Sequence, residues 1–544
     1  KARLLNIFGK FEYIQSEPSK MLNRAIFILL LTLHFSSSFA QLKRYDQNIV
    51  SAKDSSLLSS FIRLFKGKPN PLIDSTSITI NKSIKSIASQ EGKRINAIHI
   101  EHRHFGTFGF SDTLFKSNLL SKAASKFHGF TSEATINKNL FFHTDEYMNP
   151  HIIAYNEKWL RDLPYIQDAR IVAFPLLDDS NSVDLYVVTK DIFPFGASLQ
   201  LKNINAYDAS ATLENIKDQG NAFSIIHNFD IDRKEKAGWG FNYIARNIMG
   251  SFIDINLGAN SLANNYANYA SSATNVYIKG NRPLLTPLSK WTGGFEWSIS
   301  RNNNVFPTIW NDSIYNANLK YNLHRFDAWT GYQLFNRSWQ FSNEHYRHFI
   351  QIRYLNNQFG ARPDNYLAQI DKNYQNIEAR LLSYTVFKQK IIRTQYLYGF
   401  GRNEDLPTGK SFTITMGQYQ RENTNLPYLG AQLETYTMQQ NEGFRHLLFS
   451  TGGSYLEDQL IDFKILATWE QISKLHYLES GYKYRSIFNL SVAETLKNKF
   501  NEALLINSIY GIPQLSKERI KGGTRISANW ESIWYNSRSF YGFR

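Results

Sequence analysis

The chain contains no cysteine in 544 residues, which excludes thiol catalysis and cysteine-ligated metal. It also lacks any apolar run long enough for a membrane-spanning helix, and its mean hydropathy is −0.39. It has no phosphate-cradling glycine loop and no dinucleotide fingerprint, and Gly109-Phe110-Ser111-Asp112 lacks the second glycine of a nucleophile elbow. These absences remove the commonest enzyme signatures, so we expect neither catalysis nor a cofactor.

Metal and nucleic-acid signals are equally sparse. The metal-like cluster comprises His99, Glu101, His102 and His104, but on a strand His102 and His104 point one way and His99 the other. We therefore predict no metal site. The net charge is +15, yet no dense basic run or aromatic platform favours nucleic acid. The positive excess suits either a scattered solvated surface or contact with outer-membrane lipid and lipopolysaccharide phosphates.

The N-terminal region has the order of a secretory signal. Asn23-Arg24 precedes an apolar run from Ala25 to Phe35, and Ser38-Phe39-Ala40 supplies small residues at the cleavage positions. We therefore interpret residues 1–40 as an upstream extension and signal peptide, which starts at Met21 and is cleaved after Ala40. Residues 41–90 follow as a leader or linker with a short amphipathic helix at 57–65.

Residues 91–194 are predicted to form a small α+β domain. Apolar residues at helical spacing from Ile152 to Leu163 predict a helix that Pro164 ends. Alternation on both sides of the turn at 178–181 then predicts a hairpin. Upstream, we expect a first strand at 95–100 and helical segments at 113–127 and 131–141.

Several motifs in this region carry a family resemblance. They are Glu91-Gly92-Lys93-Arg94-Ile95, Asn139-Leu140-Phe141, Asn156-Glu157, Leu160-Arg161, Leu163-Pro164-Tyr165-Ile166, Asp168-Ala169-Arg170-Ile171 and Ser182-Val183-Asp184 with Val187 and Thr189-Lys190-Asp191. Together they resemble a POTRA domain of the BamA-type outer-membrane assembly and bacterial surface-antigen family, in its single-POTRA form. Weaker likeness extends to Arg282–Gly294 and Tyr398–Pro407.

The resemblance implies roles for two sets of residues. The structural set of the POTRA domain is Asn156, Glu157, Leu160, Leu163, Pro164, Tyr165 and Ile166. The strand edge that captures unfolded clients is Asp168, Ala169, Arg170, Ile171, Val172, Ala173 and Phe174. An extended client segment can join such an edge through backbone hydrogen bonds with little sequence preference.

Residues 195–544 show the period-two alternation of membrane strands. Aromatic residues reach 15%, as expected for interfacial girdles. The apolar positions of the clearest segments are Ile253, Ile255 and Leu257; Ala317, Leu319, Tyr321 and Leu323; Phe412, Ile414 and Met416; and Ile526, Ala528 and Trp530. About 20 residues per strand and turn predict a transmembrane antiparallel barrel of about 16 strands. The alternative is a soluble sandwich of the same period.

Loops and the chain end complete the barrel prediction. Asn260–Ala273, Gln358–Asn373 and Asn423–Pro427 are expected to be external loops. Ser539–Arg544 stops in mid-strand, so we expect a truncated reading frame in which the last strands are missing and the barrel cannot close with its normal seam.

Relatives fold a loop into the lumen on an Ile/Val-Arg-Gly-Phe/Tyr motif whose arginine anchors the loop to the barrel wall. The counterpart here is either Gly511, Ile512, Pro513, Gln514 and Leu515, or Ile520, Lys521, Gly522 and Gly523. The first lacks the arginine, and the second keeps only a basic residue and glycine. This departure puts full assembly activity in doubt.

The resemblance predicts an outer-membrane protein of a Gram-negative-type bacterium, with its POTRA domain in the periplasm. It would capture unfolded outer-membrane clients by strand addition and pass them to the barrel seam for insertion or translocation, alone or with assembly lipoproteins. The alternatives are a dedicated secretion translocator, a passive outer-membrane channel and a structural surface protein.

Overall fold

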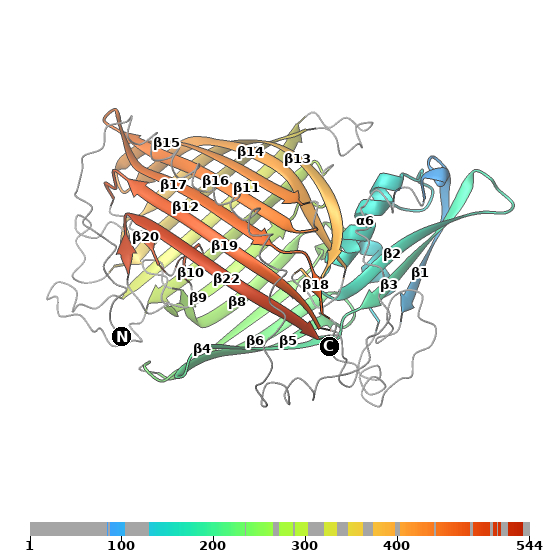
Figure 1. Ribbon diagram of the computed structural model, residues 1–544, viewed down its shortest axis with the longest axis horizontal. Helices are drawn as coiled ribbons and strands as arrows, with labels where there is room; N and C mark the ends of the chain where they lie inside the picture. Colours follow the sequence, from blue (N-terminus) through green and yellow to red (C-terminus); the bar gives the residue numbers. More distant parts are fainter. Residues whose placement is uncertain are drawn as a thin grey trace, which may run out of the picture.

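The computed structural model describes two connected parts, a small α+β domain and a large antiparallel barrel (Figure 1). The described residues are 84, 87–103, 130–233, 235–264, 271–286, 289–302, 320–334, 346–362, 374–397, 403–439, 442–478, 482–500, 504–506, 508, 510–512 and 520–536. The expected signal peptide, the linker helix at 57–65 and the expected helix at 113–127 lie outside these residues. The helices in the described part of the chain are too short or too polar to serve as membrane spans.

The small domain is a three-stranded sheet with two helices. Its elements are η2 (Ala88–Gln90), β1 (Arg94–Arg103), α5 (Glu133–Lys138), α6 (Pro150–Asp162), β2 (Ile166–Pro175) and β3 (Ser182–Asp191). The strand order is β1-β3-β2, in which β1 runs parallel to β3 and β2 runs antiparallel to it. β2 is therefore an edge strand of this sheet.

Local signals position α6 as the sequence predicts. The side chain of Asn149 accepts hydrogen bonds from the backbone N–H groups of His151 and Ile152, and Pro150 occupies the first turn. The buried face of the helix includes Ile153 and Leu160, which join one hydrophobic core with the sheet. The predicted helix and hairpin are confirmed.

The barrel strands follow in chain order. They are β4 (Phe195–Asn203), β5 (Ala206–Ile216), β6 (Asn221–Asp230), β7 (Ala237–Ala245), β8 (Asp254–Asn264), β9 (Ser271–Arg282), β10 (Trp291–Asn302), β11 (Tyr321–Leu334), β12 (Arg347–Ala361), β13 (Ile377–Gln395), β14 (Asn403–Arg421), β15 (Thr424–Met438), β16 (Phe444–Leu456), β17 (Gln459–Ile472), β18 (His476–Tyr477), β19 (Tyr482–Leu496) and β22 (Thr524–Asn536). A short 3-10 turn, η3 (Ile248–Gly250), lies between β7 and β8, and β20 (Leu504–Leu505) pairs with β21 (Lys521–Gly522) outside the barrel order. Within the described residues the barrel has sixteen long strands besides the two-residue β18, which confirms the predicted architecture.

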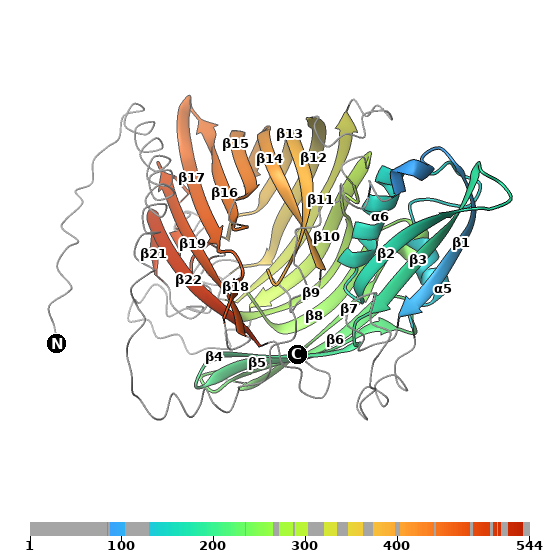
Figure 2. The ribbon, with the colours of Figure 1, turned by 45° about the vertical axis from the view of Figure 1, so that its right-hand side comes forward.

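The strand order closes on itself, with β22 and β4 as neighbours at the junction. From β4 through β19 to β22, successive long strands share a continuous antiparallel register. β22 and β4 are hydrogen-bonded neighbours, and their contact closes the ring. In Figures 1 and 2 the two strands approach each other near the small domain and separate toward the opposite end of the barrel. We call this junction the seam. A closed order over the described strands differs from our expectation that closure would need further strands.

Alternation along the strands separates an outward from an inward face. Trp530 of β22 is 73% exposed, whereas Arg525 on the other face is buried. The apolar face at Tyr321 and Leu323 is turned inward: each residue is only 3% exposed, and both pack with Tyr374. At the beginning of β11 an inward cluster is therefore also apolar, and Phe326 lies on the exposed side.

The predicted external loops were too long. β8 continues to Asn264 and β9 begins at Ser271, so both ends of the expected loop at 260–273 are strand. β12 includes residues 358–361, and β15 begins at Thr424. Polar composition alone misled the prediction, because alternate positions of a barrel strand face a wet interior.

Candidate functional site

The small domain is fastened to the barrel through the turns that follow β5 and β7. Asn215 donates from its side-chain amide to the Thr131 hydroxyl at 2.9 Å. Asn247 donates to the backbone oxygen of Lys138 at 2.7 Å, and Phe252 packs edge-on against Phe141. These contacts join helix α5 and its flanks to one side of the barrel end.

A second set of contacts joins α6 to β13 and β14, which are six strands further along the ring. Ala154 and Tyr155 of α6 cluster with Ile391 of β13. Because its two attachment points are well separated in the strand order, the small domain extends across the end of the barrel, as Figure 2 shows.

The centre of this second contact is a buried cluster of four charges, which we call the ion cluster: Glu157, Arg161, Arg393 and Asp405. The Arg161 guanidinium lies 2.7 Å from both the Asp405 and the Glu157 carboxylates. Arg393 reaches Glu157 at 3.0 Å and Asp405 at 3.2 Å. The side chains of Arg161 and Asp405 are each 1% exposed. Two cations and two anions thus neutralise each other away from water. We call this contact between α6 and strands β13 and β14 the joint.

The same cluster reaches the edge of β2. Arg161 donates to the backbone oxygen of Ala169 at 2.9 Å, and the Glu157 carboxylate accepts from the Ile171 N–H at 3.1 Å. Asp168 accepts from the side chain of Asn403 in β14 at 2.9 Å. The joint therefore includes residues of the β2 edge, which the sequence analysis predicted to capture clients.

Burial raises the pKa of the carboxyl groups in the joint, whereas pairing with arginine lowers it. Burial raises the pKa of Glu157, but Arg161 and Arg393 outweigh it and leave the pKa below its ordinary value of 4.5. For Asp168, burial outweighs the neighbouring Arg161 and raises the pKa. Burial likewise raises the pKa of Asp162 despite its ion pair with Lys158.

These shifts predict how the stability of the joint depends on pH. A depressed pKa at Glu157 stabilises the joint above pH 4.5, and this contribution is lost as the pH falls through the folded-state pKa. The raised pKa of Asp168 has the opposite sign, so protonation of Asp168 in mild acid stabilises the folded state. We expect the wild-type joint to hold at pH 5 and to weaken below pH 4, measured by denaturant unfolding followed by Trp159 fluorescence. Glu157→Gln should flatten this acid loss, and an unchanged acid loss in that variant would contradict the assignment.

The other predicted POTRA residues lie in the core or the joint, except Pro164, which is exposed just after the end of α6. Asn156 accepts from the Phe141 N–H and donates to the Asn139 backbone oxygen, which ties α6 to the segment after α5. Leu160, Leu163, Tyr165 and Ile166 are buried in the domain core. Sequence reasoning missed the partners in β13 and β14, because nothing local links them to α6.

The predicted edge residues differ in exposure. Ala169 and Ile171 are buried, Arg170 and Phe174 are exposed, and Asp168, Val172 and Ala173 are intermediate. Ala173 packs partly buried against the domain core, whereas Phe174 packs edge-on against Tyr186.

The segment between β19 and β22 contacts β22 through an arginine of the strand. Arg525 donates to the Leu505 backbone oxygen at 3.1 Å and also contacts the Ser508 hydroxyl, and Ser527 donates to the Tyr510 backbone oxygen. Gly511 and Ile512 close a turn onto Ser508 and Ile506, whereas 513–515 lie outside the described residues. Ile520, Lys521, Gly522 and Gly523 are exposed. Arg525 and Ser527 therefore hold this segment against β22.

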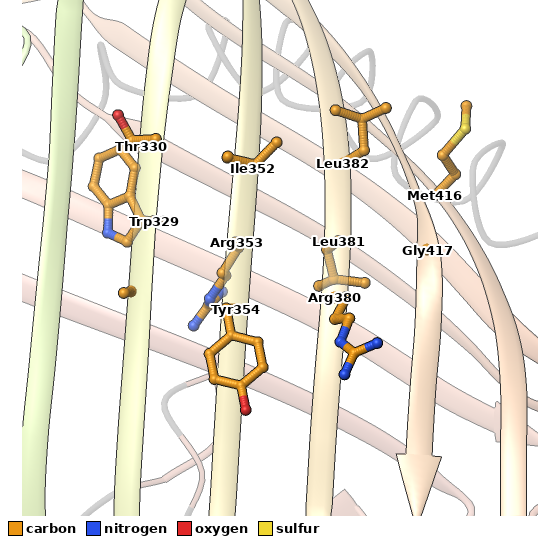
Figure 3. Close-up of a pocket in the computed structure, with 11 residues that line it drawn as sticks. Trp329, Thr330, Ile352, Arg353, Tyr354, Arg380, Leu381, Leu382, Met416 and Gly417 are labelled. Atoms are coloured by element: carbon orange, nitrogen blue, oxygen red, sulfur yellow. The ribbon is translucent and has the colours of Figure 1, made fainter.

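A hollow of about 690 Å³ lies over the middle of β11 to β14 (Figure 3). Thr330, Ile352, Leu382 and Met416 cross the four strands in one row of paired residues. Ile352 and Met416 are more than half exposed, so this row belongs to the outward apolar face. We assign the hollow no chemistry.

The predicted histidine cluster also serves packing. His99 stacks on Tyr186, and His102 hydrogen-bonds Thr189 at 3.1 Å, while His104 lies outside the described residues. No group of three acidic or histidine side chains in the described residues is arranged to hold a metal ion.

Comparisons with known proteins found similarity to solved structures only. No protein-family model matches the chain, and no curated protein matches it. BamA from Haemophilus ducreyi lacking POTRA domains 1–3 is 9% identical with a TM-score of 0.31, covering 83% of this chain and 82% of that one. CdiB from Acinetobacter baumannii is 10% identical with a TM-score of 0.36, covering 96% and 88%. CdiB from Escherichia coli is 10% identical with a TM-score of 0.38, covering 85% and 74%.

Proposed function

We propose that the chain is an outer-membrane barrel protein that inserts or translocates client proteins, with its small domain in the periplasm. One observation carries this proposal. The molecule combines an edge strand, β2 of the small sheet, with a barrel whose first and last strands, β4 and β22, meet at the seam. A strand edge can accept an extended segment through backbone hydrogen bonds once its outward groups are released from their present partners. The two edges belong to parts of the molecule that are fastened together.

Transfer between two strand borders requires no hydrolysis and no cofactor. A client strand that leaves the periplasm gains free energy by burying its apolar face in lipid, provided that its backbone groups are paired throughout. An incoming strand at the seam would meet that condition, because neighbouring strand edges supply donors and acceptors at the correct spacing.

Assembly of many barrel proteins and dedicated export of one client remain two forms of this proposal. A passive channel is disfavoured by the small domain, which extends across the barrel end through contacts at the β7–β8 turn and at β13–β14. A surface adhesion role would depend on segments at the opposite end of the barrel.

The proposal is tested by depleting the complete gene product in its native host and quantifying the outer-membrane proteome. Loss of many unrelated barrel proteins would support general assembly, and loss of one or two exported proteins would support a dedicated translocator. Complementation with the intact gene is the control. An unchanged proteome after verified depletion would overturn both forms.

A further inference from the structure

The outward backbone groups of β2 are already occupied where α6 lies against them. In an antiparallel strand, alternate residues direct both backbone groups to the same side. Because Ile171 donates to Glu157 and Ala169 accepts from Arg161, these two residues face away from β3. The Ala169 N–H donates to the Asp168 side chain at 2.9 Å. Three outward groups are thus paired with side chains in the positions where another strand would bind.

The remaining outward border of β2 is short. Ala173 is the next outward residue, and Pro175 ends the strand without an N–H to donate. An incoming strand that used only Ala173 and the neighbouring backbone oxygen atoms would form little more than one hydrogen-bonded residue pair. Stable addition of a client therefore requires the groups of Ala169 and Ile171 as well.

Each side chain that covers the β2 edge also holds a barrel residue. Arg161 binds Asp405, Glu157 binds Arg393, and Asp168 binds Asn403. The same three side chains cannot keep these contacts and also leave the edge, because Asp405, Arg393 and Asn403 are fixed in β13 and β14. Uncovering the edge therefore requires these side chains to release the barrel residues that dock the domain.

We propose that docking of α6 on β13 and β14 closes the β2 edge, and that a client strand binds there only when the ion cluster opens. The Glu157 carboxylate and the Arg161 guanidinium take the place of a client's backbone. Glu157 accepts from the Ile171 N–H, and Arg161 donates to the Ala169 oxygen. This inference rests on the proposed function for the nature of the incoming partner, an extended segment of an unfolded barrel protein. It adds that client binding and domain docking exclude each other.

The test changes only the barrel side of the joint, which leaves α6 and β2 intact. Arg393→Gln with Asp405→Asn removes the charges that hold Arg161 and Glu157, and Asn403→Ala is a milder second variant. The matched control is Arg353→Gln with Asp327→Asn, an arginine–aspartate pair at 2.8 Å between β12 and β11. Intact barrels are verified by heat-modifiable electrophoretic mobility of the full chain in detergent.

A locked form provides the opposite perturbation. Since the chain has no cysteine, Ala154→Cys with Ile391→Cys can be joined selectively by a short bis-maleimide. These two residues belong to the same apolar cluster between α6 and β13.

Two readouts separate the inference from the function on which it rests. The first is hydrogen exchange of the amides at 168–173. The second is fluorescence anisotropy with a labelled synthetic peptide of residues 524–536, an alternating membrane strand. We expect the barrel-side variants to raise exchange and to bind the peptide at least about tenfold tighter than wild type, a shift of about 1.4 kcal/mol. The locked form should bind least, and the control should match wild type.

The outcomes differ for the two proposals. Equal exchange and equal peptide binding in wild-type, opened and locked forms would overturn the closed-edge inference. Faster exchange in the opened variants without peptide binding in any form would support the coupling and count against β2 as a client site. Tight binding that is equal in the docked and opened forms would support the client site and overturn the coupling.

Discussion

Replacement of Arg161 by alanine is expected to destabilise the joint by about 3–5 kcal/mol, the usual cost of removing one partner from a buried ion pair. The side chain of Arg161 is 1% exposed and contacts Glu157, Asp405 and the Ala169 oxygen. Its loss leaves two buried carboxylates with Arg393 as their remaining cation. Denaturant unfolding in detergent, followed by tryptophan fluorescence, measures the effect; Trp159 lies two residues from Arg161.

Arg170→Ala is the matched control for this substitution. Arg170 is an exposed arginine on β2, and its removal should change stability by less than about 0.5 kcal/mol. A loss below about 1 kcal/mol in Arg161→Ala would mean that water enters the joint and screens the pair. Combining Arg161→Ala with Asp405→Asn should cost less than the sum of the two single changes, because both remove the same interaction.

The helix α6 and the β2–β3 hairpin were predictable because their signals are local. Pro150, Pro164 and the turn around Asp179 define where each element begins or ends, and the side chain of Asp179 does accept from the Asn181 N–H and the Ser182 hydroxyl. The resemblance also singled out Glu157 and Arg161. It could not supply Arg393 and Asp405, because more than 230 residues of chain and the register of the intervening strands separate them from α6.

Barrel strands were harder to delimit than to detect. Strand length was underestimated at Thr424–Pro427, where the residues pair with 418–421 of β14 although Asn425 and Pro427 resemble turn residues. The inward direction of Tyr321 and Leu323 could not be read from alternation alone, since period two does not say which face is lipid.

The segment that carries the counterpart of the lumen-loop motif is held against β22 by an arginine outside that counterpart. The sequence indicated that the anchoring arginine was absent from Gly511–Leu515, and it is absent there. Arg525 of β22 instead donates to the Leu505 backbone oxygen.

Gly220→Ala is expected to be the second most damaging single change, with a loss of about 2–4 kcal/mol from backbone strain and overpacking together. Gly220 has φ +77°, and an added Cβ would lie 2.6 Å from a ring carbon of Tyr165. Its N–H also donates to the side chain of Asn215, which itself binds Thr131 of the small domain. The substitution therefore strains the turn and separates the two parts at once.

Gly92→Ala isolates the backbone contribution. Gly92 has nearly the same φ, +79°, but an added Cβ there would meet nothing within 4 Å. It should cost only the left-handed strain of about 1–2 kcal/mol. Replacing Tyr165 by leucine in the Gly220→Ala background should then recover part of the loss by relieving the contact. Equal losses at Gly92 and Gly220, without recovery by Tyr165→Leu, would show that the ring yields freely and that this turn does not hold the domain to the barrel.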